Sequence, residues 1–291
     1  MSSKHGLVLA ALGALALLGC RQPEAVHPAL WQVDGPKGEK AWLLGTIHAL
    51  PAPVNWHSPR IDGALAASDR IVLEVARIDN DAAVAQTFAA LGTAPSPSPL
   101  RSRLPGEAQA DYDAYLKRYG VKDASLAAMD TWAGALVLAQ AAQQGAGSDS
   151  ANGVDRAVKA EARGRPVEEF EGADAQLRIF EALPEAEQRD LLLTVIADTG
   201  DVRSQTRQME RAWGRGDLAA IETETTRGML ADPELRAALL TGRNRAWLGQ
   251  LTAMLGKGQR PFVAVGMAHL VGPDGLPALL TARGYRVTRV Q

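Results

Sequence analysis

The pattern of apolar positions indicates strands at the two ends of the chain and helices in the middle. Residues 30–33 and 42–44 are short apolar runs, and the turn-forming residues 34–38 separate them. Short apolar runs bounded by glycine, proline or aspartate are typical of buried strands. We therefore predict a hairpin, whose second strand ends at Gly45 and is followed by a loop that contains His48.

The C-terminal end repeats this arrangement. Residues 260–265 are predicted to form a strand, and Gly266-Met-Ala-His269 follows it, a second Gly-x-x-His motif. Each motif is followed by a proline-containing loop, a short helix and another strand, at residues 70–75 in the first unit and 285–290 in the second. A strand–helix–strand crossover makes its two strands parallel and places its loops at the carboxyl edge. The repeat therefore predicts equivalent positions for His48 and His269.

The middle of the chain, from about residue 79 to 256, is predicted to be mostly helical because its apolar residues recur at helical spacing. Turn signals at residues 95–99, 145–150 and 214–217 separate these helices, and residues 167–171 form one more short strand. The fold class is therefore α/β (α+β). A central mixed sheet is built from the N- and C-terminal units, with a large helical insertion between them.

The first residues have the character of an export signal. Residues 6–18 form an apolar run that is too short for a comfortable membrane span. The run ends in Leu17-Leu18-Gly19-Cys20, which resembles a bacterial lipobox, and Cys20 is the only cysteine. We predict a lipoprotein signal peptide at residues 1–19, lipidation of Cys20, a tether to residue 28 and one domain at residues 29–291. The alternative is a plain secretory signal with an incidental cysteine.

The predicted location is the bacterial cell envelope. Arg21 stands where an aspartate would favour retention in the inner membrane, so resemblance to the usual sorting pattern favours an outer-membrane anchor that faces the periplasm. The composition is otherwise that of a globular protein, with 46% hydrophobic residues, 22% charged residues and a net charge of -2. No basic patch stands out, so nucleic acid is not expected as a partner.

Three residues at the predicted strand ends carry the candidate chemistry. His48, Glu74 and His269 each follow a strand, and ligands bind outside the carboxyl ends of strands in open α/β sheets. Two imidazoles and one carboxylate form a common ligand set for a catalytic divalent metal such as Mn, Co or Zn. Glu74 has an alternative role as a general base, beside a metal or beside a histidine without one. For each residue a purely structural role is the competing interpretation.

A wider set of motifs resembles the TraB/GumN family, which is related to the Tiki metalloproteases and to the erythromycin esterase and ChaN-like fold. The motifs are the two Gly-x-x-His sequences and Glu74, with weaker matches around Asp155, Glu171, Trp213 and Arg243. The resemblance implies metal-dependent peptide cleavage by His48, Glu74 and His269. It also implies that Arg243 lies nearby and holds a carboxylate or an oxyanion. Glu171 is a further candidate carboxylate, and Met267 is expected to shape the pocket.

Three hypotheses remain in competition at this point, and the last of them is an envelope scaffold with a vestigial site. The first is a lipid-anchored, metal-dependent hydrolase that acts on a peptide or protein. The second is a non-catalytic lipoprotein that binds a peptide or heme through the same histidines. His57, in the loop after His48, is a candidate for the pocket rim, with exposure in the loop as the alternative. No serine has the setting of a nucleophile elbow, and no glycine-rich phosphate loop is present.

Overall fold

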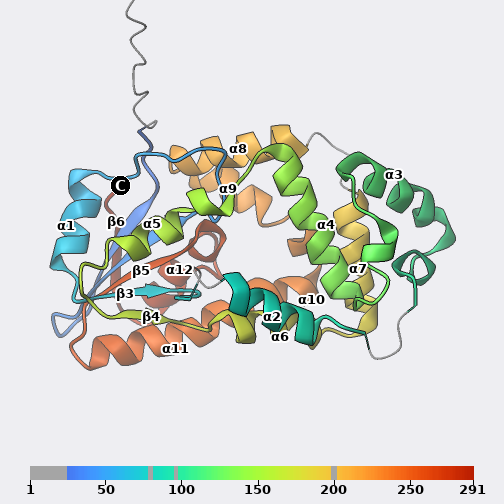
Figure 1. Ribbon diagram of the computed structural model, residues 1–291. Coiled ribbons are helices and arrows are strands. Elements are labelled where there is room, and N and C mark those ends of the chain that lie inside the picture. The colour runs from blue at the N-terminus through green and yellow to red at the C-terminus, as the bar shows by residue number, and fades with distance from the viewer. Residues whose placement is uncertain (1–24, 78–80, 95–97, 198–201) are drawn as a thin grey trace, which may run out of the picture.

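The computed structural model describes residues 25–77, 81–94, 98–197 and 202–291 (Figure 1). The apolar run and the lipobox at Cys20 lie outside these residues. Within the described ranges, no helix combines the length and the apolar character that a membrane span requires.

A six-stranded mixed sheet forms the centre of the fold, as the sequence predicts. The strands lie in the order β4-β3-β5-β2-β1-β6. The β2, β3, β4 and β5 strands run parallel, and β1 is antiparallel to both of its neighbours. The bounds are β1 Leu30–Asp34, β2 Lys40–Thr46, β3 Arg70–Leu73, β4 Val167–Glu169, β5 Pro261–Gly266 and β6 Arg286–Arg289.

Both predicted strand–helix–strand units are present. In the first, α1 (Pro59–Ala67) connects β2 to β3; in the second, α12 (Leu276–Ala282) connects β5 to β6. Ser58 begins α1 because its side chain accepts a hydrogen bond from the Ile61 amide, and Pro59 already has the backbone φ of the first turn. The two units interleave, so that β5 of the second lies between β2 and β3 of the first.

The interleaving brings β2 and β5 side by side with a definite register. Thr46 pairs with Gly266, and Gly45 pairs with Val265. The two Gly-x-x-His motifs are therefore offset by one residue, and the expectation that their histidines occupy equivalent positions is wrong. After β2 the chain enters an open loop, so His48 is exposed, whereas after β5 it forms a 3-10 turn that buries His269.

The helical middle contributes to two cores. Helices α5, α8, α9 and α11 pack with the sheet, while α3, α4 and α7 form a second core together with their neighbours. The whole sheet and both cores lie within residues 25–291. The helices are α2 Asp81–Leu91, α3 Gln109–Tyr119, α4 Thr131–Ala146, α5 Val154–Ala160, α6 Ala173–Glu181, α7 Glu185–Ala197, α8 Val202–Gly214, α9 Leu218–Glu224, α10 Pro233–Arg236 and α11 Gly242–Gly256.

Candidate active site

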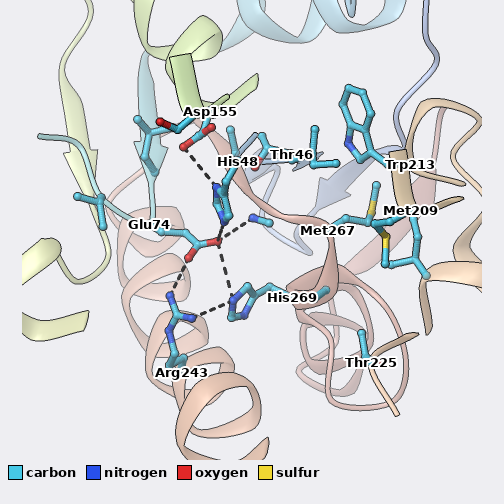
Figure 2. A pocket seen from close by; sticks show the side chains of 18 of the residues that line it. Thr46, His48, Glu74, Asp155, Met209, Trp213, Thr225, Arg243, Met267 and His269 are labelled. Carbon is cyan, nitrogen blue, oxygen red and sulfur yellow. Dashed lines mark hydrogen bonds and ion pairs between the residues drawn. The ribbon is translucent and has the colours of Figure 1, made fainter. Parts of the chain in front are cut away.

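The carboxyl ends of β2, β5 and β3 meet at one pocket of about 520 Å³. His48 follows β2, His269 follows β5 and Glu74 comes directly after β3. Figure 2 shows the Glu74 carboxylate between the two imidazoles, with Arg243 on its far side. The sequence prediction that these three strand ends form one site is therefore consistent with the geometry.

Glu74 is buried and held by two donors. Its Oε1 atom accepts a hydrogen bond of 2.7 Å from the Gly266 amide, and its Oε2 atom accepts one of 2.7 Å from Nη2 of Arg243. Burial opposes the charge on Glu74, but the surrounding imidazoles, Arg243 and the Gly266 amide outweigh it and lower the pKa of this carboxyl. Glu74 is therefore ionised at neutral pH. A side chain at position 266 would lie only 3.1 Å from Oε1, which explains the glycine.

Both imidazoles direct Nε2 toward the same oxygen of Glu74. The distance to Oε1 is 3.8 Å from His48 and 3.9 Å from His269. This leaves the Nδ1 atom of each ring to contact the protein behind it.

His269 is fixed on both sides. Its Nδ1 lies 2.6 Å from Oδ1 of Asn244, and because an amide oxygen only accepts, Nδ1 carries the proton. The Nε2 lone pair then accepts a hydrogen bond of 3.2 Å from Nη1 of Arg243. Burial lowers the pKa of His269 far below its ordinary value, although the charge of Glu74 acts in the opposite direction. The ring is therefore neutral, with its lone pair toward the pocket.

His48 is the more accessible of the two histidines, with 59% of its side chain exposed. Its Nδ1 lies 3.3 Å from Oδ2 of Asp155, the second residue of α5. Partial loss of solvent around the ring opposes its charge, but the hydrogen bond to Asp155 and the charge of Glu74 raise the pKa of His48. Asp155 thus orients the ring, and its other oxygen has no hydrogen-bond partner among the residues described.

All three guanidinium nitrogens of Arg243 donate hydrogen bonds to groups of the protein itself. Its Nε donates to Glu171 at 2.9 Å and Nη2 donates to Glu74, while Nη1 also donates to the Leu239 carbonyl at 3.1 Å. The guanidinium lies over the ring of Trp247, 4.8 Å from its centre. Arg243 thus lies at the site and holds carboxylates, in agreement with the expectation, and the carboxylates are Glu74 and Glu171 of the protein itself.

Two other sequence candidates, Glu171 and His57, lie away from the pocket. Glu171 is behind Arg243, where it also accepts a hydrogen bond of 2.7 Å from Nε1 of Trp247. His57 stacks on Trp56 and pairs with Asp62 at 2.6 Å, because the loop after β2 turns it away from the sheet. Neither residue lines the pocket. The expected place of Glu171 in the pocket is therefore wrong, and for His57 the geometry favours the alternative, a position in the loop away from the rim.

Met267 does line the pocket, as expected. Its side chain occupies the space that a Cβ atom at Gly45 would need, since that atom would lie 2.2 Å from Cε of Met267. The first motif glycine thus makes room for a neighbouring side chain, not for a ligand. Met209 and Trp213 of α8 complete this apolar wall, and Nε1 of Trp213 donates to the Gly45 carbonyl at 2.9 Å.

Sequence reasoning assigned no role to the residues that orient the two rings. Asp155 and Asn244 lie in the weaker family motifs around Asp155 and Arg243. Their contacts with His48 and His269 depend on how α5 and α11 pack against the sheet, which the sequence does not show. Thr46 was also missed: its side chain is buried at the pocket wall, and its hydroxyl has no hydrogen-bond partner in the described part of the chain.

The sequence matches the TraB/PrgY/gumN family over residues 29–289. The chain belongs to this family. The match covers the whole sheet and both Gly-x-x-His motifs, so the site described above lies within the TraB/PrgY/gumN domain. Comparisons with curated proteins and with solved structures gave no match.

Proposed function

We propose that this TraB/PrgY/gumN protein is a lipid-anchored, divalent-metal-dependent hydrolase of peptides in the cell envelope. The main support is the arrangement of two imidazole nitrogens around one carboxylate oxygen, at 3.8 and 3.9 Å. Each ring is oriented by a hydrogen bond from its other nitrogen, to Asp155 or Asn244. Metal-binding histidines are commonly supported in this way.

The residues fit Mn, Co or Zn by donor type, and two of them also by protonation state. Metal ligands must be deprotonated, and the lowered pKa values leave Glu74 ionised and His269 neutral. The raised pKa of His48 means that this ring would have to release a proton when it binds the ion. The ligand atoms are near one another but not yet at the spacing of a bound metal. Each Nε2 atom lies within 4 Å of Oε1 of Glu74, whereas the two Nε2 atoms are more than 4.8 Å apart. The exposed ring of His48 is the one with room to approach. A bound ion would acidify a water molecule and polarise the substrate carbonyl.

A metal-free mechanism has less support. A general base works best when its pKa is near the operating pH. The pKa values of Glu74 and His269 are both lowered, so neither group takes a proton readily at neutral pH, and the raised pKa of His48 means that this ring already carries one.

The pocket wall favours a peptide with an apolar side chain next to the bond that is cleaved. Beside the charged site, the lining is largely apolar and comes from several distant parts of the chain. Pockets of this kind recognise ligands by apolar contact and orient them with a few polar groups. The apolar lining residues include Ile47, Leu73, Met209, Trp213, Ile221, Leu230 and Met267.

Metal analysis of residues 21–291 tests the proposal. We expect about one Mn, Co or Zn ion per chain, and loss of the ion in His48→Ala and His269→Ala. His57→Ala is the matched control, because His57 lies outside the pocket, and it should keep the ion. Wild-type protein that binds none of these metals at neutral pH would rule out the metal mechanism.

Catalysis is tested separately, by cleavage of a library of apolar peptides. We expect the Glu74→Gln variant to lose turnover while thermal unfolding shows that it remains folded. A non-catalytic peptide binder would instead keep its affinity in this variant and show no cleavage in the wild type. Hemin titration separates the remaining alternative, since a Soret band that shifts in His269→Ala would indicate heme binding and contradict the hydrolase.

The role of Asn244 gives a further prediction. Removing its side chain in Asn244→Ala releases the His269 ring, and we expect metal affinity to fall by about 10- to 100-fold. Competition with a chelator measures the change. Asn55→Ala is the control, because Asn55 is exposed and far from the pocket, and an equal loss in both variants would contradict the orienting role.

A further inference from the structure

The outer face of α8 carries a row of arginines that the whole-chain charge conceals. Arg203, Arg207 and Arg211 of α8 and Arg215, which directly follows its last residue, are spaced four residues apart, and all four are exposed. Residues four apart lie on the same face of a helix. The opposite face of α8 carries Met209 and Trp213, which line the pocket. The helix therefore has one face for the fold and one basic face toward solvent.

The basic face borders the point at which the described chain begins. The amide of His27 donates to the Gly214 carbonyl at 2.7 Å, at the end of α8. Figure 1 shows the start of the described chain and α8 together along the upper edge of the molecule. Cys20 is five positions before Ala25, so a lipid on Cys20 would lie within about 17 Å of this edge even at full extension.

An exposed apolar loop completes this surface. Pro51, Ala52 and Pro53 are exposed in the loop after His48. Together with Ala25 and with Arg207, Arg211 and Arg215, they line one groove of about 1150 Å³. Arginine side chains that flank exposed apolar residues are typical of surfaces that rest in the headgroup region of a membrane.

The charges on this surface are largely unneutralised. Among the described residues, no salt bridge is formed by Arg207, Arg211 or Arg215. Glu210, half-buried between them, offsets one charge, and its own pKa is raised mainly by burial. An anionic surface is thus the complementary partner, because exposed arginines without carboxylate partners attract negative charge.

We propose that the arginine face of α8 and the loop at residues 51–53 dock on anionic phospholipid headgroups. The proposal rests on the lipid anchor proposed above only for its biological setting, since the surface itself lies in the described chain. A single acyl chain holds a protein weakly, and a basic surface beside it makes the attachment stable. Docking through α8 would fix the orientation of the protein on the membrane. The outer face of α8 would contact the headgroups, and its inner face lines the pocket.

Flotation of residues 21–291 with vesicles tests the proposal without the acyl group. We expect binding to phosphatidylcholine vesicles that contain phosphatidylglycerol, weaker binding at high salt, and none to phosphatidylcholine alone. Each basic residue near an anionic surface strengthens binding by roughly five-fold. The Arg207→Gln, Arg211→Gln, Arg215→Gln triple variant should therefore bind at least about ten-fold more weakly.

The control removes the same charge elsewhere. Arg245, Lys257 and Arg283 are exposed at other sites, and their triple glutamine variant should bind as the wild type does. Equal losses in the two variants, or no binding to the anionic vesicles, would overturn the proposal. Tighter binding to a DNA duplex than to the vesicles would also overturn it. Mass spectrometry of the full chain tests acylation of Cys20 independently, so failure of the anchor and failure of the docking face are distinguishable.

Discussion

Replacing Arg243 with methionine should lower the free energy of unfolding by about 3–5 kcal/mol. The reason is that Arg243 lies between two buried carboxylates, Glu74 at 2.7 Å and Glu171 at 2.9 Å. Only 11% of the arginine side chain and 7% and 12% of the glutamate side chains are exposed. Without the guanidinium, two negative charges remain buried close together. Denaturation with urea measures the change.

The matched control is Arg245→Met, two residues further along α11. Its side chain is 70% exposed and lies 4.0 Å from Asp274, so its removal should change stability by less than about 0.5 kcal/mol. Adding Glu171→Gln to Arg243→Met removes one of the unpaired charges and should restore part of the stability. If Arg243→Met unfolds at the same urea concentration as Arg245→Met, the buried charge network does not contribute as described.

Trp213→Ala is the second substitution with a large expected effect. Trp213 is 1% exposed, packs α8 against the sheet and donates a hydrogen bond to the Gly45 carbonyl. Truncation of a buried tryptophan creates a cavity and costs about 3–5 kcal/mol. Because the residue also forms a wall of the pocket, the variant should accept larger apolar side chains in the substrate. Urea denaturation and peptide-library cleavage measure the two effects.

Trp213→Phe separates packing from hydrogen bonding. The phenyl ring keeps most of the contact area but leaves the buried carbonyl without its donor, which costs about 1–3 kcal/mol. We expect a smaller loss than in Trp213→Ala and little change in substrate preference. Equal losses in the two variants would contradict a packing role for the ring.

The principal elements of the site were predictable from sequence because each follows a recognisable strand. The apolar runs before His48, Glu74 and His269 fix their positions at strand ends, and parallel strands carry those ends to one edge. The strand order was not predictable, since no local pattern states that β5 inserts between β2 and β3. The roles of Asp155 and Asn244 also depend on helix docking, which periodicity alone does not specify.

Two features of the structure were not predicted from the sequence for simpler physical reasons. The sequence shows four arginines at intervals of four residues, but the net charge of -2 averages over the whole chain and hides a local basic face. Arg243 was expected near the site from the family resemblance, but the sequence did not show which carboxylates it holds. Its pairing with Glu74 and Glu171 joins residues 169 and 72 positions apart, a contact that no short-range pattern reveals.

The one-residue offset between β2 and β5 gives the two motif glycines different environments. Successive residues of a strand point to opposite faces, so Gly45 and Gly266, which are one step out of register, serve opposite sides of the sheet. One glycine admits Met267 and the other admits the Glu74 carboxylate. The two copies therefore contribute differently: the N-terminal copy supplies Glu74 and the exposed His48, and the C-terminal copy supplies the buried His269. Glu74 and His269 would hold a divalent metal from fixed positions, and the exposed His48 ring would be the ligand with freedom to adjust.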